Sequence, residues 1–331
     1  MKRLPQIWLL LFLLMLLAGS GTTQSTQWNG YVQWRYHTNW DQSNGFSIRR
    51  AKAWIKGHIS NLSNLKFKVQ AIFRPQNKGA LVLQDAYGEY RWTGFSLRVG
   101  QMVPAFSLQR YQPDYRIPLV ERAQVIKTLI PSAETGARDI GMQLHWALSR
   151  NRLEVFGGIF NGNGGNQLKN EDTHFLLTYR SIWHLVNTNA SQAQLGASFA
   201  YRKTSGMVFK KILGPEVIFR GRDARFGLEG RLQVKQFLLQ GEWIQARLGE
   251  DRAVGYYLLA SLLAASQHQW TFSIERYRDA IDQTDDPYWF ILGYAYRWRQ
   301  DKAKLMVDSR IRKDKDAWHP QITIQLQWFF N

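Results

Sequence analysis

Polar and apolar residues alternate with a period of two through most of the chain. In residues 321–330 every even position is apolar, and the odd positions as far as Gln327 are glutamine or threonine. Successive side chains of a strand point to opposite faces, so this stretch predicts a strand with one apolar face and one uncharged polar face. Such a pattern is typical of a strand with lipid outside and water inside, which closes a barrel against the first strand.

The same alternation recurs in short segments that turn residues separate. It predicts an all-β fold, a transmembrane antiparallel barrel of about sixteen strands, with fourteen and eighteen as the alternatives. Thr93-Gly94 is a hairpin signal, and residues 41–45 and 60–64 are predicted turns or loops. The predicted strands are 31–37, 50–59, 65–73, 81–92, 95–101, 140–148, 152–160, 175–182, 194–202, 225–234, 236–247, 253–264, 269–277, 288–298, 302–312 and 321–330.

Residues 102–137 do not alternate. Four prolines in this segment exclude regular central strands, and a connection of this length is functional or folded on itself. A short helix is expected around residues 121–128. The segment is predicted to fold into the lumen and narrow the pore; folded outside, it would be an extracellular cap.

Residues 1–21 have the pattern of a signal peptide. Lys2 and Arg3 precede an apolar run at 7–17, and small residues at 18–20 place cleavage near 20–25. The alternative is a membrane anchor, although the run is shorter than the roughly 20 residues of a spanning helix. Residues 26–331 are then a single outer-membrane barrel, and export disfavours a nucleic-acid partner.

Tryptophans lie near the predicted strand ends, where the aromatic girdles of a membrane barrel are expected. A soluble exported β-protein with core aromatics is the alternative. The girdle candidates are Trp28, Trp34, Trp40, Trp54, Trp92, Trp270, Trp289, Trp298, Trp318 and Trp328.

The net charge of +18 predicts attraction to anions, and the absence of cysteine excludes disulfides and thiolate chemistry. On the polar faces of the predicted strands, which would line the lumen, basic residues outnumber acidic ones. A narrow passage ringed by Arg and Lys favours anions. The alternative is a solvated face whose charges pair across strands with Asp85 or Glu89. The candidate anion-binding residues are Arg50, Lys52, Lys56, Lys66, Lys68, Arg98, Arg110, Arg116 and Arg122.

Several motifs resemble those of the phosphate-selective porins O and P. Residues 46–52 (FSIRRAK) resemble the family's F-x-[LI]-R-R-A-[RK] segment. Residues 83–87 and 97–106 resemble its D-A-Y and G-Q-x-x-P-F stretches, and 121–122, 138–141 and 160–164 continue in the family's order. The resemblance implies a sixteen-stranded barrel in the outer membrane of a Gram-negative-type bacterium, usually a homotrimer, with a basic lumen. It also implies that Arg49 and Arg50 are pore-lining arginines.

The leading hypothesis is an anion-selective diffusion porin, with small inorganic anions such as phosphate or polyphosphate as solutes and membrane lipid around it. The alternative is a general diffusion porin without phosphate specificity. Less favoured are a barrel enzyme and a soluble polyanion-binding β-protein. The chain has no G-x-S-x-G, H-E-x-x-H or G-x-x-x-x-G-K-[ST] motif, so no catalytic residue, cofactor or metal is predicted.

Overall fold

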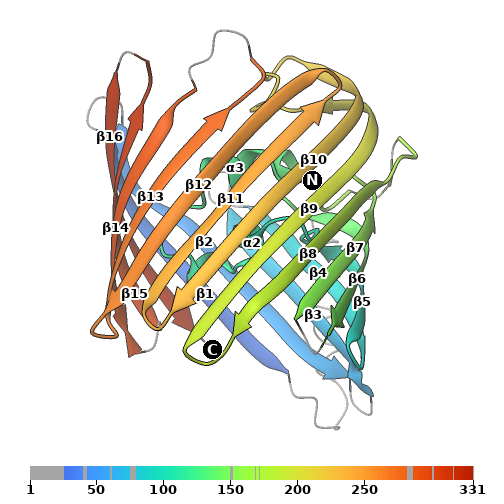
Figure 1. The fold of residues 1–331 in the computed structure, drawn as a ribbon, viewed down its shortest axis with the longest axis horizontal. Coiled ribbons are helices and arrows are strands. Elements are labelled where there is room, and N and C mark those ends of the chain that lie inside the picture. The colour runs from blue at the N-terminus through green and yellow to red at the C-terminus, as the bar shows by residue number, and fades with distance from the viewer. Residues whose placement is uncertain are drawn as a thin grey trace.

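The described part of the chain forms sixteen antiparallel strands that close into one barrel (Figure 1). This computed structural model describes residues 26–39, 43–59, 62–74, 80–149, 152–167, 169–170, 172–281, 286–299, 302–315 and 317–330. Each strand pairs with its sequence neighbours, and the last strand pairs with the first. No helix in these ranges is long and apolar enough to cross a bilayer. The strands are β1 (Gln27–Asn39), β2 (Ser43–Ile59), β3 (Leu62–Arg74), β4 (Ala80–Trp92), β5 (Phe95–Met102), β6 (Asp139–Leu148), β7 (Leu153–Phe160), β8 (Leu176–Asn187), β9 (Ser191–Val208), β10 (Ile218–Val234), β11 (Phe237–Leu248), β12 (Asp251–Ala264), β13 (His268–Arg278), β14 (Tyr288–Trp298), β15 (Ala303–Lys313) and β16 (Trp318–Phe330).

All sixteen predicted segments are strands, but several begin earlier or end later than the alternation indicated. The loop predicted at 41–45 is wrong from Ser43 onward, because Ser43 pairs with Asn39 and Asn44 with Thr38. Likewise β3 begins at Leu62, inside the turn predicted at 60–64. The predicted signal peptide at 1–21 lies outside the described residues.

The outer surface of the barrel is apolar. On β16, Leu326 is 37% exposed on the outside, whereas Gln325 and Gln327 are each 1% exposed on the inside. This confirms that the apolar parity of this strand faces outward. Two predicted girdle residues are wrong: Trp54 and Trp289 lie on the inner parity and line lumenal cavities, because the pleat of β2 and β14 turns them inward.

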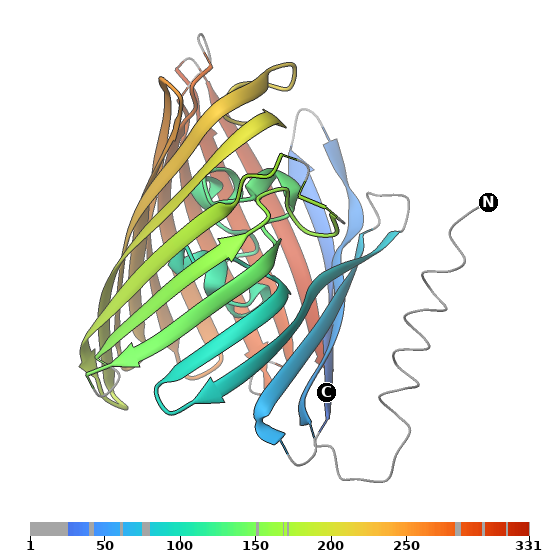
Figure 2. The ribbon, with the colours of Figure 1, turned by 90° about the vertical axis from the view of Figure 1, so that its right-hand side faces the viewer.

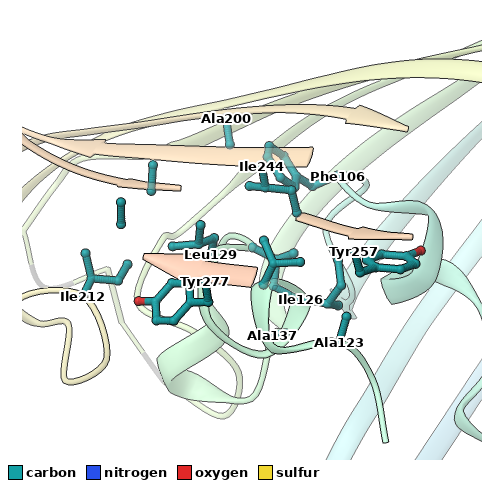
Figure 3. Close-up of a cluster of buried hydrophobic side chains, with 14 of the residues drawn as sticks. Phe106, Ala123, Ile126, Leu129, Ala137, Ala200, Ile212, Ile244, Tyr257 and Tyr277 are labelled. Carbon is teal, nitrogen blue, oxygen red and sulfur yellow. The ribbon is translucent and has the colours of Figure 1, made fainter. Parts of the chain in front are cut away.

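Residues 103–138, which we call the lumenal loop, fold into the barrel as predicted (Figures 1 and 2). The predicted helix near 121–128 is present in part. Apolar loop residues, among them Phe106, Ile126 and Leu129, pack against Ile244 and Tyr257 of the barrel wall (Figure 3). Burial of this apolar surface is the reason that the loop lies inside and is not an external cap. Its short helices are α2 (Leu108–Tyr111), η2 (Asp114–Arg116), α3 (Gln124–Thr128) and η3 (Ala133–Thr135).

The inner face of β11, β12 and β14 is shaped to receive the loop. It is partly apolar there, with Ile244, Leu259 and Ile291 buried against the loop. Glycines provide the necessary space: a Cβ on Gly293 would lie 2.5 Å from Leu119 Cδ2, and one on Gly255 would lie 3.1 Å from Val125 Cβ. The loop therefore fills the β10–β14 side of the lumen and leaves the β1–β5 side open.

Candidate functional site

Two cavities, of about 310 and 390 Å³, lie between the lumenal loop and the wall formed by β1–β5. Five residues line both cavities, and we call this shared ring the neck. Lys52 comes from β2 and the other four from the loop. The neck residues are Lys52, Arg110, Asp114, Arg122 and Arg138.

The surface of the two cavities is strongly basic. Eleven Lys or Arg residues and four Asp or Glu residues line them, so cations outnumber acids in the described lining. The basic residues are Arg49, Arg50, Lys52, Lys56, Lys68, Arg98, Arg110, Arg122, Lys127, Arg138 and Lys211, and the acidic ones are Asp85, Asp114, Glu121 and Glu134.

A β-bulge places two consecutive arginines on the inner face of β2. Gln33 of β1 pairs with Arg50, whereas the next residue, Trp34, pairs with Ile48, so Arg49 is an extra residue. A bulge interrupts the alternation and re-aims a side chain. Arg49 and Arg50 therefore both line the second cavity. The sequence carries a signal for this bulge: the apolar residues stand at even positions before it, 46 and 48, and at odd positions after it, 51 and 53.

A second bulge turns Gln84 and Asp85 of β4 inward together. Gln70 Nε2 donates to Gln84 Oε1 at 2.8 Å. Asp85 bridges two cations, Lys68 at 2.6 Å and Arg138 at 3.1 Å. This bridge ties the end of the lumenal loop to β3 and β4, and it neutralises part of the positive charge at the neck.

Asp114 lies at the centre of the neck and is surrounded by cations. Lys52 Nζ donates to it, Arg122 Nη2 lies 2.7 Å away and Arg50 Nε 3.8 Å away. Burial alone would raise the pKa of Asp114, but Lys52, Arg122 and Arg50 together hold that pKa well below its usual range. Asp114 is therefore a fixed anion inside a ring of donors.

Glu121 is a second fixed anion of the loop. It accepts from Arg35 Nη1 at 2.7 Å and from Arg49 Nε at 2.6 Å, and Arg50 Nη2 lies 3.6 Å away. Burial opposes ionisation, yet Arg50 and its basic neighbours hold the pKa of Glu121 well below its usual range. Asp114 and Glu121 thus fasten the loop to β1 and β2.

Acidic residues of β11, β13 and β15 bind the lumenal loop through its backbone. Each of these acids accepts at least one amide N–H of the loop. A carboxylate that accepts from backbone N–H groups makes a charge-assisted bond. The bonds are Leu108 N and Gln109 N to Glu242 at 3.0 and 2.7 Å, Val120 N to Asp308 at 2.9 Å, and Gln124 N to Glu275 at 3.0 Å.

Eight of the ten predicted anion-binding residues line the two cavities: Arg49, Arg50, Lys52, Lys56, Lys68, Arg98, Arg110 and Arg122. Lys66 and Arg116 are outside both linings, and Arg116 is exposed beside the ring of Tyr115. The alternative of cross-strand pairing holds for two members, because Lys68 pairs with Asp85 and Arg98 with Glu89.

Sequence reasoning missed Asp114, Glu121 and Arg138 as parts of the site. Asp114 and Glu121 lie in the segment without periodicity, so no pleat assigns their direction. Both are acids in a loop where basic residues outnumber acidic ones, and Glu121 also lies in the family motif at 121–122.

The family model for the phosphate-selective porins O and P matches residues 23–280. The chain belongs to this family. It is an outer-membrane porin, as the sequence resemblance predicted, and family and fold support a channel rather than an enzyme. No curated protein matches the chain.

Solved porin structures share the fold at low sequence identity. An anion-selective porin from Comamonas acidovorans has a TM-score of 0.68 and 12% identity, over 93% of this chain and 100% of that one. Salmonella typhi OmpF in complex with daunomycin has a TM-score of 0.67 and 11% identity, over 92% and 97%. OmpT of Vibrio cholerae in its trimer form has a TM-score of 0.62 and 10% identity, over 93% and 100%.

Proposed function

We propose that this porin is an anion-selective diffusion channel that favours phosphate or polyphosphate. The observation that carries the proposal is the excess of Lys and Arg over Asp and Glu around the two cavities that meet at the neck. A ring of fixed cations in a narrow aqueous passage attracts anions and repels cations.

The route follows the open side of the lumen. An anion that enters the second cavity meets Arg49 and Arg50, crosses the neck, and leaves the first cavity past Lys56 and Lys68. At the neck it competes with Asp114 for the surrounding donors. This competition keeps binding weak enough for release, which conduction requires.

Three further features belong to the proposal. The family description supports phosphate as the solute, and the anion-selective relative from Comamonas acidovorans supports an anion of some kind. The trimer form of Vibrio cholerae OmpT supports a homotrimer. Residues 1–21 are proposed as a cleaved leader and residues 26–331 as a single barrel, and transport proceeds by diffusion without catalytic turnover, cofactor or metal.

A general diffusion porin without phosphate specificity is the second candidate. The observation that favours it is pairing: Asp85, Glu89, Asp114 and Glu121 all form ion pairs with cations of the lumen. Each pair lowers the charge available to a solute.

Reversal potentials across planar bilayers test the proposal. In a potassium chloride gradient, the purified porin should give a potential of the sign set by chloride. A potential of the sign set by potassium would contradict anion selectivity. Competition of phosphate with chloride for the current then separates a phosphate-preferring channel from a general one.

A further inference from the structure

The outer wall of the barrel carries six basic residues on five consecutive strands, β9 to β13, which lie side by side in Figure 1. They occupy outward positions at the end of the barrel where the lumenal loop joins β5 to β6 and residues 209–217 join β9 to β10. The opposite end has short turns, such as 93–94 and 235–236. Longer loops of bacterial barrels face the cell exterior, so these residues lie on the side of the outer leaflet. We call them the basic belt: Lys203, Arg222, Arg247, Arg252, Arg276 and Arg278.

The strand register brings members of the basic belt together. Arg222 of β10 pairs with Lys203 of β9, and Arg247 of β11 pairs with Arg252 of β12. Arg247 also faces Ala224, two residues from Arg222, so the two like-charged pairs are diagonal neighbours. Like charges directly opposite each other destabilise a sheet. An anion bound across these strands would relieve that repulsion.

Strand β13 extends the basic belt. Arg278 pairs with Val254, two residues from Arg252 on β12. Arg276, on the same face of β13, lies over the ring of Tyr288 on β14, with 4.6 Å from its guanidinium carbon to the ring centroid. The cations therefore form one continuous row across the five strands.

The protein itself neutralises little of this charge. Within the described residues, the side chains of Lys203, Arg222 and Arg252 form no ion pair. Arg278 Nε lies 3.6 Å from Asp286, but the Arg278 side chain is 66% exposed, and exposed ion pairs are weak. Most of the positive charge of the basic belt thus remains available to an external anion.

Neighbouring residues place the basic belt at the membrane–water interface. Tyr201 precedes Lys203 by two positions on the same face of β9, and tyrosine is enriched at this interface. Outward positions at the same end of β1–β8 are uncharged in the described ranges; examples are Phe46, Leu81 and Leu177. The charge is therefore concentrated on one side of the barrel and does not form a general girdle.

We propose that the basic belt binds the phosphate groups of a phosphorylated glycolipid of the outer leaflet, the lipid A part of lipopolysaccharide. Guanidinium groups bind phosphate oxygens in a bidentate manner, and rows of Lys and Arg at a membrane surface attract anionic lipids. The apolar wall below the basic belt, which includes Phe199, Phe226 and Leu258, would contact the acyl chains. This combination favours a lipid over a soluble anion. The site lies on the outer wall and is separate from the proposed route through the lumen.

The test is binding of lipid A to the purified porin in detergent, titrated by native mass spectrometry. Diphosphorylated lipid A should bind at least about tenfold more tightly than lipid A from which both phosphates have been removed. Arg222→Gln combined with Arg247→Gln should weaken binding of the diphosphorylated lipid at least about tenfold. Arg152→Gln combined with Lys235→Gln is the matched control, because it removes two exposed cations from turns at the opposite end of the barrel. The control should leave the affinity unchanged.

A second variant and a competitor sharpen the test. Lys203→Gln combined with Arg252→Gln removes the other member of each like-charged pair and should also weaken binding. Heat-modifiable gel mobility verifies barrel closure, so this variant decides the question should the first fail to close. Inorganic phosphate at the concentration of the lipid should not displace it, because the two phosphates and the acyl chains of lipid A bind together.

Equal binding of phosphorylated and dephosphorylated lipid A would overturn the inference. So would an unchanged affinity in a folded belt variant, an equal loss in the control variant, or displacement of the lipid by inorganic phosphate. A belt variant with altered oligomeric state and unaltered lipid binding would assign this surface to a second copy of the chain, and would overturn it too. Failure of the proposed function is a separate result, because it appears as a cation-selective reversal potential in the wild type.

Discussion

Lys52 of β2 donates to Asp114 of the lumenal loop, and this ion pair joins the barrel wall to the loop at the neck of the lumen. Asp114 is thus an anion at the neck, and the cations that bind it are those that a permeating anion would also contact. Asp114 sets how much of the positive charge at the neck remains available to a permeating anion.

Replacement of Asp114 by Asn should increase anion selectivity. Removal of one unit charge at about 4 Å changes the interaction with a monovalent anion by about 1 kcal/mol under water-like screening, so the chloride-to-potassium permeability ratio should rise by up to about fivefold. Reversal potentials measure this ratio. Asp314→Asn is the control, since Asp314 pairs with Arg312 outside the two cavities. A ratio that falls, or stays the same, would count against the role given to Asp114.

Deletion of Arg49 should leave a folded barrel. Gln33 and Trp34 would then pair with two adjacent residues of β2, Arg50 and Ile48. The bulge disappears, and the side chains of β2 keep the faces they have now. Deletion of Ala53 is the matched control: it would turn Arg50 and Lys52 toward lipid, at about 2–4 kcal/mol each near the bilayer midplane. Heat-modifiable mobility should be kept by the first deletion and lost by the second. The same outcome for both would disprove the bulge assignment.

Glu242→Gln should loosen the seat of the lumenal loop. The carboxylate accepts from Leu108 N, Gln109 N and the Tyr257 hydroxyl, and the amide can satisfy fewer of these donors. Loss of a hydrogen bond to a charged group costs about 1.5–3 kcal/mol. Single-channel recordings should therefore show larger current fluctuations. Glu250→Gln, on an exposed turn, should be silent; equal noise in both variants would contradict the anchoring role.

Anion selectivity should decline as the pH rises through about 8. Burial lowers the pKa of Lys127 to about 8, although Glu121 and Glu275 oppose the shift, and Arg310 and Arg49 reinforce it. Below this pH Lys127 is charged; above it the second cavity loses one positive charge. The permeability ratio measured at pH 7 and at pH 9 should therefore fall. In Lys127→Gln this step should be absent, and a step that persists would assign the titration to another group.

The sequence predicts the barrel because alternation is local and each strand shows it independently. The constriction is different, because its geometry depends on contacts between distant positions. Leu108 N reaches Glu242 across 134 residues, and neither residue has a neighbour in sequence that indicates this bond. Trp54 shows the same limit: the sequence indicated a girdle residue, whereas in the structure Trp54 lies inside the barrel and stacks on Tyr115 of the loop, with ring centroids 5.9 Å apart.

The charges at the neck are the centre of the proposed mechanism, and the reversal potential of a neck variant tests them most directly. Lys52→Gln combined with Arg138→Gln removes one wall cation and one loop cation from the ring that lines both cavities. The wild type should be chloride-selective in a potassium chloride gradient, and the double variant should lose most of that preference. A cation-selective wild type, or a folded double variant with an unchanged reversal potential, would contradict the account.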